Sequence, residues 1–264
     1  MKKKNKTVLI TGPTSGIGLE LTHLFAQDNI NLILASRNKK LLLKIQNDIL
    51  KKYNIIVNVY PVDLSKSGSA RKLYNFCIRK KIIVDYLVNN AGFGKYGLFT
   101  QTSLNTELDM IHLNITSLTE LTKLFGLKMK KRGFGKILNI ASTASFQPGP
   151  FMSVYSATKN YVLSFSEAIA EEFRGSGVSV TTLCPGPTIS GFQKRAGFKD
   201  DAKMYNSLAI VDSKQVAQFG YNKMMSNHRL VIFGLINRLS ILIVKFLPSS
   251  FKTYLVKKVY NYYH

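Results

Sequence analysis

Acidic residues, cysteine and tryptophan are scarce in this chain of 264 residues. Cysteine occurs only at Cys77 and Cys184, which excludes a disulfide framework and makes a reducing compartment such as the cytoplasm the expected location. No uncharged apolar run reaches about 18 residues, so a simple membrane-spanning helix is not expected. The hydrophobic share of 45% is that of an ordinary globular protein and excludes a disordered or collagen-like chain.

Signals for export and for metal binding are also weak. The basic start from Met1 to Lys6 is similar to the first part of a signal peptide, but Gly12 and Pro13 interrupt the apolar stretch that follows. We therefore expect no cleaved targeting segment. The four histidines and two cysteines show no spacing typical of metal ligands, and we expect no metal site.

Positive charge dominates, because 37 Lys and Arg stand against 14 Asp and Glu, a net charge of +23. Such an excess favours polyanions: nucleic acid, anionic lipid or phosphorylated small molecules. After Asp212 basic residues continue without a single acidic one, interleaved with apolar runs such as 239–244. This mixture fits a membrane surface better than a nucleic-acid groove, and no nucleic-acid-binding module is recognisable. The alternative is a compositional bias in which the lysines are simply solvated.

The C-terminal region predicts two amphipathic helices separated by Pro248. In the first, Arg238 and Lys245 lie two helical turns apart on one face, while leucine, isoleucine and phenylalanine cover most of the rest. Each helix is too short to span a bilayer, which favours a position in the membrane interface. The alternative is that this apolar face packs on the core, over a substrate pocket or against a second subunit.

Short β-branched runs alternate with longer helical stretches along most of the chain. The expected strands are 7–11, 31–36, 55–60, 84–89, 135–142, 178–184 and 229–233, and the expected helices include 16–27, 65–80, 103–130 and 153–174. This alternation indicates a parallel sheet covered on both faces. A polar stretch over 188–228 interrupts it and is typical of a lid. We expect one domain, 1–234, that includes this lid, and a helical extension, 235–264.

A glycine-rich turn, Thr11-Gly12-Pro13-Thr14-Ser15-Gly16-Ile17-Gly18, joins the first strand to the first helix. Glycine accepts positive φ angles and lets the backbone approach a diphosphate, while the helix N-terminus offers free N–H groups to that anion. Many glycine turns are only turns. Its position after the first strand of an alternating pattern favours dinucleotide binding.

The end of the second strand, Ala35-Ser36-Arg37-Asn38, bears on the choice of cofactor. An acidic residue here would bind the ribose 2′-hydroxyl of NAD, whereas a nearby arginine suits the 2′-phosphate of NADP. No acid is present, and Lys39 and Lys40 follow, so the sequence favours NADP. The alternative is that Arg37 is a solvated loop residue.

A tyrosine and a lysine four residues apart, Tyr155 and Lys159, share one face of an expected helix. A free tyrosine has a pKa near ~10 and exchanges protons poorly at neutral pH, whereas a neighbouring ammonium lowers that pKa. Such a pair by itself is common on protein surfaces.

Together the motifs resemble those of the short-chain dehydrogenase/reductase family, from Thr7 to Thr188. The resemblance rests on the glycine turn, Asn89-Asn90-Ala91-Gly92, Asn114, Ser142, the segment from Tyr155 to Lys159, and Pro185-Gly186 with Thr188, in this order. Pro13 departs from the small residue usual in the family and removes one potential N–H donor to phosphate.

The resemblance implies a Rossmann-type, doubly wound α/β fold with about seven parallel strands, and a hydride transfer between NADPH and a carbonyl or secondary alcohol. It implies that Tyr155 is the general acid/base, that Ser142 hydrogen-bonds the substrate carbonyl, and that Lys159 binds the nicotinamide ribose and lowers the Tyr155 pKa. Asn114 would order a water in a proton relay. The implied cofactor-binding residues are Gly12, Thr14, Ser15, Gly16, Ile17, Gly18, Arg37, Asp63, Leu64, Asn90, Ala91, Gly92, Tyr155, Lys159, Pro185, Gly186 and Thr188. Among them Asp63 would contact the adenine and Asn90 the adenosine ribose.

Within the family the chain is most similar to the broad-specificity branch with hydroxysteroid and long-chain 3-oxoacyl reductases, which implies an apolar substrate. Phe146, Phe151, Phe192 and Phe198 are candidates for its pocket, although core packing is the commoner reason for any single one of them. The family also implies a homodimer or homotetramer, paired through the helices at 103–130 and 153–174. A non-catalytic NADP-binding sensor or scaffold is the alternative function.

Overall fold

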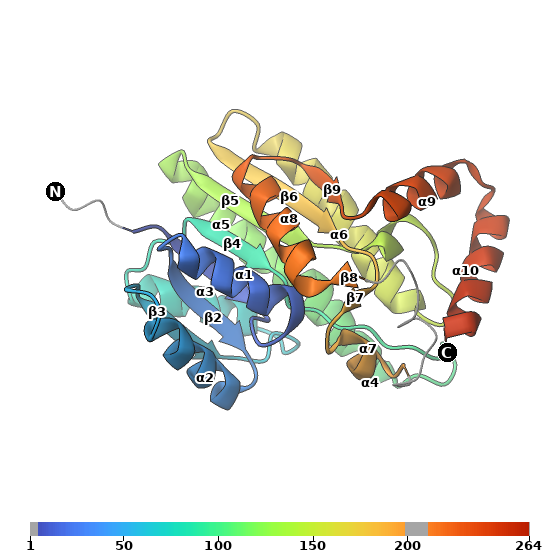
Figure 1. Ribbon diagram of the computed structural model, residues 1–264, viewed down its shortest axis with the longest axis horizontal. Coiled ribbons are helices and arrows are strands. Elements are labelled where there is room, and N and C mark those ends of the chain that lie inside the picture. Colours follow the sequence, from blue (N-terminus) through green and yellow to red (C-terminus); the bar gives the residue numbers. More distant parts are fainter. Residues whose placement is uncertain (1–4, 199–210, 264) are drawn as a thin grey trace.

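The computed structural model describes residues 5–198 and 211–263. At its centre is a seven-stranded sheet in the order β3-β2-β1-β4-β5-β6-β9, in which every neighbouring pair is parallel (Figure 1). These strands are β1 (Thr7–Thr11), β2 (Asn31–Ser36), β3 (Val57–Pro61), β4 (Tyr86–Asn89), β5 (Gly135–Ile140), β6 (Val178–Cys184) and β9 (Leu230–Ile232). The expected Rossmann-type sheet of about seven parallel strands is confirmed.

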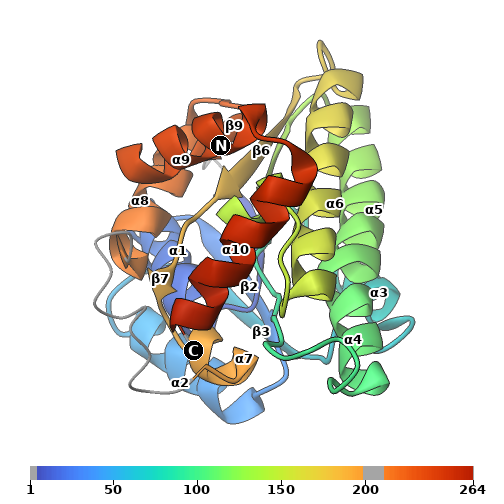
Figure 2. The ribbon, with the colours of Figure 1, turned by 90° about the vertical axis from the view of Figure 1, so that its right-hand side faces the viewer.

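Helices cover both faces of the sheet. On one face lie α1 (Gly16–Gln27), α2 (Lys39–Leu50) and α8 (Ser213–Met225), and on the other lie α3 (Ser69–Arg79), α5 (Leu118–Arg132) and α6 (Ser153–Glu172) (Figure 2). The remaining elements are α4 (Leu104–Ile111), the π-helix η1 (His112–Ser117), the 3₁₀-helix η2 (Thr143–Phe146), α7 (Phe192–Ala196), α9 (Leu235–Phe246), α10 (Ser249–Tyr263), and the two-stranded pair β7 (Thr188–Ile189) and β8 (Val211–Asp212).

The apolar strands are buried on both faces, which is why they read as continuous hydrophobic runs. In β1, Val8 and Ile10 belong to the core beneath α1 and α2, whereas Leu9 belongs to the core beneath α3 and α5. All three side chains are fully buried. Each contributes about 1.5–3 kcal/mol by leaving water, so both helical layers are held to the sheet by alternate residues of one strand.

The strand order reverses between β1 and β4. From β1 the chain builds outward through β2 and β3, then returns to β4 on the other side of β1 and continues through β5, β6 and β9. Loops after β1 and β4 therefore leave the sheet in opposite directions and open a crevice at the carboxyl ends of these strands, where ligands bind in folds of this kind. The glycine turn follows β1, and Asn90 follows β4.

Two expected segments differ from the structure. The helix expected over 103–130 is interrupted by the π-helix η1 between α4 and α5. Residues 213–225, expected within a polar lid, form the core helix α8, in which Val216 and Met224 are fully buried and Tyr221 packs edge-on against Phe25. Polar residues between these apolar positions hide the helical period in the sequence. The structure, not the sequence, shows which face of α8 is buried.

The C-terminal extension is helical, as expected. Gly234, with a φ of 88°, turns the chain from β9 into α9, and Pro248 precedes α10. Figure 1 shows both helices at the end of the molecule opposite the N-terminus. Within residues 5–198 and 211–263, no helix combines the length and the apolar character needed to cross a membrane.

Candidate active site

A cavity of about 700 Å³ opens at the carboxyl ends of the central strands, a size typical of small-molecule sites. Seventeen of the residues assigned from the sequence line it: Gly12, Thr14, Ser15, Gly16, Ile17, Arg37, Asp63, Leu64, Asn90, Ala91, Gly92, Ser142, Tyr155, Lys159, Pro185, Gly186 and Thr188. Gly18 and Asn114 are not part of the lining. Fold and spacing thus bring the motifs to one place.

The glycine turn needs glycine at three positions for two different reasons. Gly12 and Gly16 have φ angles of 66° and 55°, in the left-handed region that other residues rarely adopt. Gly18 sits beneath the turn, where an added Cβ atom would lie 2.2 Å from the carbonyl oxygen of Gly12. The first two shape the turn, and the third lets α1 pack directly beneath it.

Asn90 holds this turn in place. Its side-chain Nδ2 donates to the carbonyl oxygens of Thr11 at 3.0 Å and of Gly12 at 2.9 Å. The Thr11 hydroxyl in turn accepts from the backbone N–H groups of Asn90 and Ala91, both at 3.0 Å. Both hydrogen bonds of the Asn90 amide donor go to the turn, so its direct effect in the structure is to hold the backbone of the turn in position. Its contact with the adenosine ribose stays a prediction.

Ser36 and Arg37 lie together at the end of β2, and both line the cavity. The Ser36 hydroxyl oxygen is buried and has no hydrogen-bond partner among the described residues. An unpartnered buried hydroxyl is costly, which indicates a ligand group at this position.

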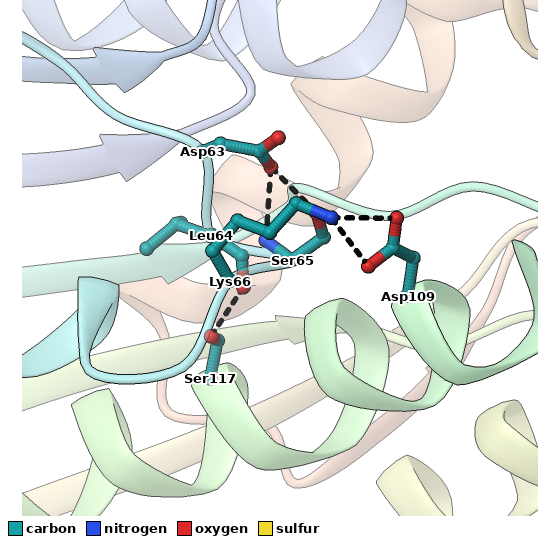
Figure 3. Close-up of polar contacts among 6 residues, drawn as sticks. All are labelled: Asp63, Leu64, Ser65, Lys66, Asp109 and Ser117. Carbon is teal, nitrogen blue, oxygen red and sulfur yellow. Dashed lines mark hydrogen bonds and ion pairs between the residues drawn. The ribbon is translucent and has the colours of Figure 1, made fainter. Parts of the chain in front are cut away.

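Asp63 stands across from Arg37 in the loop after β3. Its Oδ1 accepts from the Ser65 backbone N–H at 3.0 Å and from the Ser65 hydroxyl at 2.8 Å, and its second oxygen points away from these donors (Figure 3). Burial alone would raise the pKa of Asp63, but the Ser65 hydrogen bonds and the charges of Arg37 and Lys66 outweigh it and lower that pKa. Asp63 is therefore an ionised acceptor.

The same loop is tied to the helical layer, as Figure 3 shows. Lys66 Nζ lies 2.9 Å from Asp109 Oδ1 in α4, and the buried Ser117 hydroxyl donates to the Leu64 carbonyl oxygen at 2.6 Å. An exposed ion pair contributes little, so the buried hydrogen bond is the firmer link. It fixes the Arg37 and Asp63 end of the cavity relative to η1.

Ser142, Tyr155 and Lys159 meet at the other end of the cavity. Ser142 caps η2, where its Oγ accepts from the Ala144 backbone N–H at 3.1 Å, and it also hydrogen-bonds the Tyr155 side chain. Lys159 is buried; its Nζ donates to the Ile140 carbonyl oxygen at 2.8 Å and lies 5.9 Å from the centre of the Tyr155 ring. A phenol, a hydroxyl and an ammonium thus share one pocket wall.

The pKa of Tyr155 differs from the expectation. Burial raises it well above its ordinary value, the Ser142 hydrogen bond lowers it, and the nearby Tyr260 raises it further. Burial also lowers the pKa of Lys159 to about 8. Burial removes water from the charged forms of both residues, the phenolate of Tyr155 and the ammonium of Lys159. This desolvation outweighs the lowering of the Tyr155 pKa that was expected from the ammonium. In this structure Tyr155 is a protonated phenol at neutral pH.

Asn114 lies in the π-helix η1, a distortion that is frequent at functional sites. Its Nδ2 donates to the Phe93 carbonyl oxygen and to the Thr158 hydroxyl, both at 3.0 Å. A Cβ atom added to Gly92 would lie 3.0 Å from Asn114 Oδ1 and 3.4 Å from Lys159 Nζ. Gly92 therefore leaves a narrow space between this amide and the ammonium.

Two of the four candidate phenylalanines line the cavity and two do not. Phe192 and Phe198 line the cavity, and the Phe192 ring lies 5.2 Å from that of Tyr155. Phe146 packs instead in a small apolar cluster with Val162, and Phe151 stacks on Tyr96 outside the lining.

Sequence reasoning missed several cavity residues because they lie far from the motifs. Val259 and Tyr260 reach the cavity from α10, and Arg195 reaches it from α7. The apolar period of α10 was visible in the sequence, but nothing there indicated which residues face a pocket. The pKa of Tyr260 is raised by burial, in keeping with its place beside Tyr155.

These features fit a nicotinamide dinucleotide. The glycine turn leaves backbone N–H groups for phosphates, the unpartnered Ser36 hydroxyl and Arg37 lie at the adenosine end, and Tyr155 and Lys159 lie at the opposite end. Fold and site together define the class of dinucleotide-dependent oxidoreductases.

The family follows from comparison with known proteins. The model of the short chain dehydrogenase family matches residues 6–200. The chain belongs to the short-chain dehydrogenase/reductase family. The chain is 33% identical to the rat very-long-chain 3-oxoacyl-CoA reductase over 67% of this chain and 57% of that protein. It is 31% identical to the ketoacyl reductase HetN of Nostoc sp. over 69% of this chain and 63% of that protein. The matched region thus makes up about 60% of these relatives.

Solved structures agree with the fold. A short-chain dehydrogenase from Sphingobium yanoikuyae, in complex with NADPH, has a TM-score of 0.81 at 27% identity, covering 90% of this chain and 92% of that one. A family member from Burkholderia phymatum in complex with NAD also has a TM-score of 0.81, at 20% identity, covering 92% and 93%. Because the one fold holds either cofactor in these two proteins, the choice depends on the residues of each chain.

Proposed function

We propose that the protein is an NADPH-dependent reductase that transfers a hydride between NADPH and a carbonyl or secondary alcohol of an apolar substrate. The observation that carries the proposal is the convergence of Ser142, Tyr155 and Lys159 on one wall of a cavity whose other end is the glycine turn. The bound nicotinamide supplies or accepts the hydride.

The side chains then handle the proton. Tyr155, whose raised pKa keeps the phenol protonated, is suited to donate its proton to the oxygen of a carbonyl as that oxygen gains charge. Ser142 orients the phenol and offers a hydrogen bond to the same oxygen. Lys159, with a pKa near 8, can return a proton to Tyr155. Asn114 would order a water beyond Lys159, as the resemblance to the family implies.

Two features support NADPH over NADH. No acidic residue stands at Ser36 or Arg37 to bind a 2′-hydroxyl, and the carboxylate of Asp63 is already hydrogen-bonded to Ser65. A 2′-phosphate is a dianion that needs cationic and hydroxyl partners, which Arg37 and Ser36 offer. Replacing Arg37 with Asp should move the preference towards NADH in a direct comparison of both reduced cofactors.

Apolar side chains favour an apolar substrate. Met152, Phe192, Phe198, Val259 and Tyr260 line the catalytic end of the cavity. A series of ketones and 3-oxoacyl substrates of rising chain length, assayed by loss of NADPH absorbance, tests this point. We expect kcat/KM to rise with chain length, since each added buried methylene contributes about 0.8 kcal/mol. A flat series would contradict an apolar pocket.

Tyr155→Phe separates this function from the alternative of a non-catalytic NADP-binding sensor. The variant loses only the hydroxyl, so cofactor affinity and thermal stability should stay close to wild type while turnover falls at least about 100-fold. Wild-type protein that binds NADPH but reduces nothing in the series, or a variant as active as wild type, would favour the sensor.

We also propose that the C-terminal extension places the enzyme on an anionic membrane surface of the cytoplasm. Large apolar side chains of α9 are exposed, with Ile243 at 63% and Phe246 at 80%. Lys245 of α9 and Lys252 and Lys257 of α10 follow in a sequence that has no acidic residue after Asp212. Each lysine near an anionic leaflet contributes about 1 kcal/mol. Arg238 contributes less, because its Nε donates to the Ile232 carbonyl oxygen at 2.8 Å.

Flotation with vesicles tests the membrane proposal. Intact protein should float with vesicles containing phosphatidylserine, less so at high salt, and a variant with Ile243→Ser and Phe246→Ser should not. Equal behaviour of both proteins would assign this face to packing or to subunit contact. We further propose that two subunits pair through the helices expected at 103–130 and 153–174, which correspond to α4, η1, α5 and α6. Light scattering of the protein as it leaves a size-exclusion column measures the number of subunits.

A further inference from the structure

A short segment of the lid lies directly on the glycine turn. A Cβ atom added to Gly16 would lie 2.9 Å from the Cβ atom of Ser190, so the Ser190 side chain lies close against the glycine turn. Gln193 Nε2 donates to the Thr188 carbonyl oxygen at 2.6 Å, and the Ala196 carbonyl oxygen accepts from a backbone N–H after β4 at 2.8 Å. The first bond holds α7 against β7, and the second holds it against the loop that follows β4.

Arg195 is carried to the cavity by this helix and lines it together with Arg37. Its Nε donates to the Gly191 carbonyl oxygen at 3.0 Å, which orients the guanidinium. Its other N–H groups have no hydrogen-bond partner among residues 5–198 and 211–263. Burial is the larger cause that lowers the pKa of Arg195, and the positive charge of Arg37 lowers it further. Two arginines from segments 158 positions apart thus approach one another closely enough to repel.

The cavity offers them little compensation. Asp63 is the single acidic side chain among the described residues that line it, and its charge already acts with Arg37. Next to Arg37, the buried Ser36 hydroxyl lacks a partner among those residues. Two guanidinium groups and an unpartnered hydroxyl form a site whose charge and donors call for a dianion.

We propose that Arg195, on the lid helix, is the second cation of a site for a phosphate monoester, built with Arg37 and Ser36, and that this site takes the 2′-phosphate of NADPH. The inference rests on the proposed preference for NADPH. Since Arg195 belongs to α7, a bond from its guanidinium to the 2′-phosphate would also tie this short helix to the cofactor.

Calorimetric titration of the purified protein with NADP⁺ and NAD⁺ tests the site without turnover. Arg195→Gln should weaken NADP⁺ by about 10- to 100-fold, the range for one charge-assisted hydrogen bond, and NAD⁺ by less than about threefold. Arg195→Lys keeps the charge without the bidentate geometry and should fall between. Lys214→Gln, an exposed change of equal charge outside the cavity lining, should leave both affinities unchanged.

A second probe, 2′-AMP, carries a phosphate monoester but no diphosphate, and Arg195→Gln should weaken it as well. Equal weakening of NADP⁺ and NAD⁺ would overturn the inference and assign Arg195 to the diphosphate. If wild type prefers NADP⁺ and only Arg37→Gln removes that preference, the inference on Arg195 fails alone. If wild type binds both cofactors equally, the proposed NADPH preference fails first. Melting temperatures of the variants show that the fold is kept.

Discussion

Lys159 should lower the stability of the protein while serving its activity. It is a buried ammonium whose Nζ makes one hydrogen bond within the described part of the chain, to the Ile140 carbonyl oxygen, and its pKa falls from 10.5 to about 8. Between these two values the unfolded chain binds more protons at this lysine than the folded chain does, so its contribution to stability becomes more favourable as pH rises. Below about pH 8 the buried lysine lowers the free energy of unfolding by its full amount, about 3 kcal/mol, because each unit of pKa shift corresponds to about 1.36 kcal/mol.

Lys159→Met removes that cost at the price of leaving the Ile140 carbonyl without its donor, about 1–3 kcal/mol. The second quantity does not depend on pH. At pH 7 the variant should therefore be as stable as wild type or up to about 2 kcal/mol more stable, while cofactor affinity and turnover fall. At pH 9.5 the cost of the lysine in wild type shrinks to about 1.4 kcal/mol, so the stability of the variant relative to wild type should drop by about 2 kcal/mol.

Urea denaturation of both proteins at pH 7 and pH 9.5 measures this difference. Using the difference cancels the titration of tyrosines and cysteines that both proteins share. Lys128→Met, on the exposed face of α5, serves as the control and should show no change between the two pH values. A stability difference between Lys159→Met and wild type that is the same at both pH values would refute a desolvated ammonium at this position.

Three further predictions follow from contacts in the structure. Gly18→Ala should weaken NADPH binding by at least about tenfold and lower the melting temperature, because its Cβ atom would lie 2.2 Å from the Gly12 carbonyl oxygen; unchanged affinity by titration would contradict the close packing under the turn. Tyr260→Ala should raise the KM of long-chain substrates more than that of short ones, since it removes an aromatic wall of the pocket, and an equal effect on both would place the side chain away from the substrate. For wild type, the turnover number in the direction of carbonyl reduction should fall above about pH 8, where Lys159 loses its proton, and a profile that is flat from pH 7 to 9.5 would contradict its part in proton return.

Sequence alone determined three largely buried strands of the sheet. The bounds of β1, β2 and β6 match the expected ranges residue for residue, because strands covered on both faces are continuous apolar runs. Motif spacing determined most of the cavity as well, since the carboxyl ends of parallel strands must meet at one edge of the sheet. Polar segments gave weaker signals, and α8 was hidden because its buried positions alternate with glutamine, lysine and asparagine.

Only the tertiary structure decided the properties that depend on what surrounds a side chain. Four-residue spacing brought Tyr155 and Lys159 together, but the protonation of both is set by burial, which no spacing reveals. The side-chain amide of Asn90 donates its hydrogen bonds to the glycine turn, which lies 72 or more positions away in the chain. Arg195 and Tyr260 join the cavity because the fold carries α7 and α10 back over it. Sequence pattern reports which face of an element is apolar; the folded chain determines which distant groups that face meets.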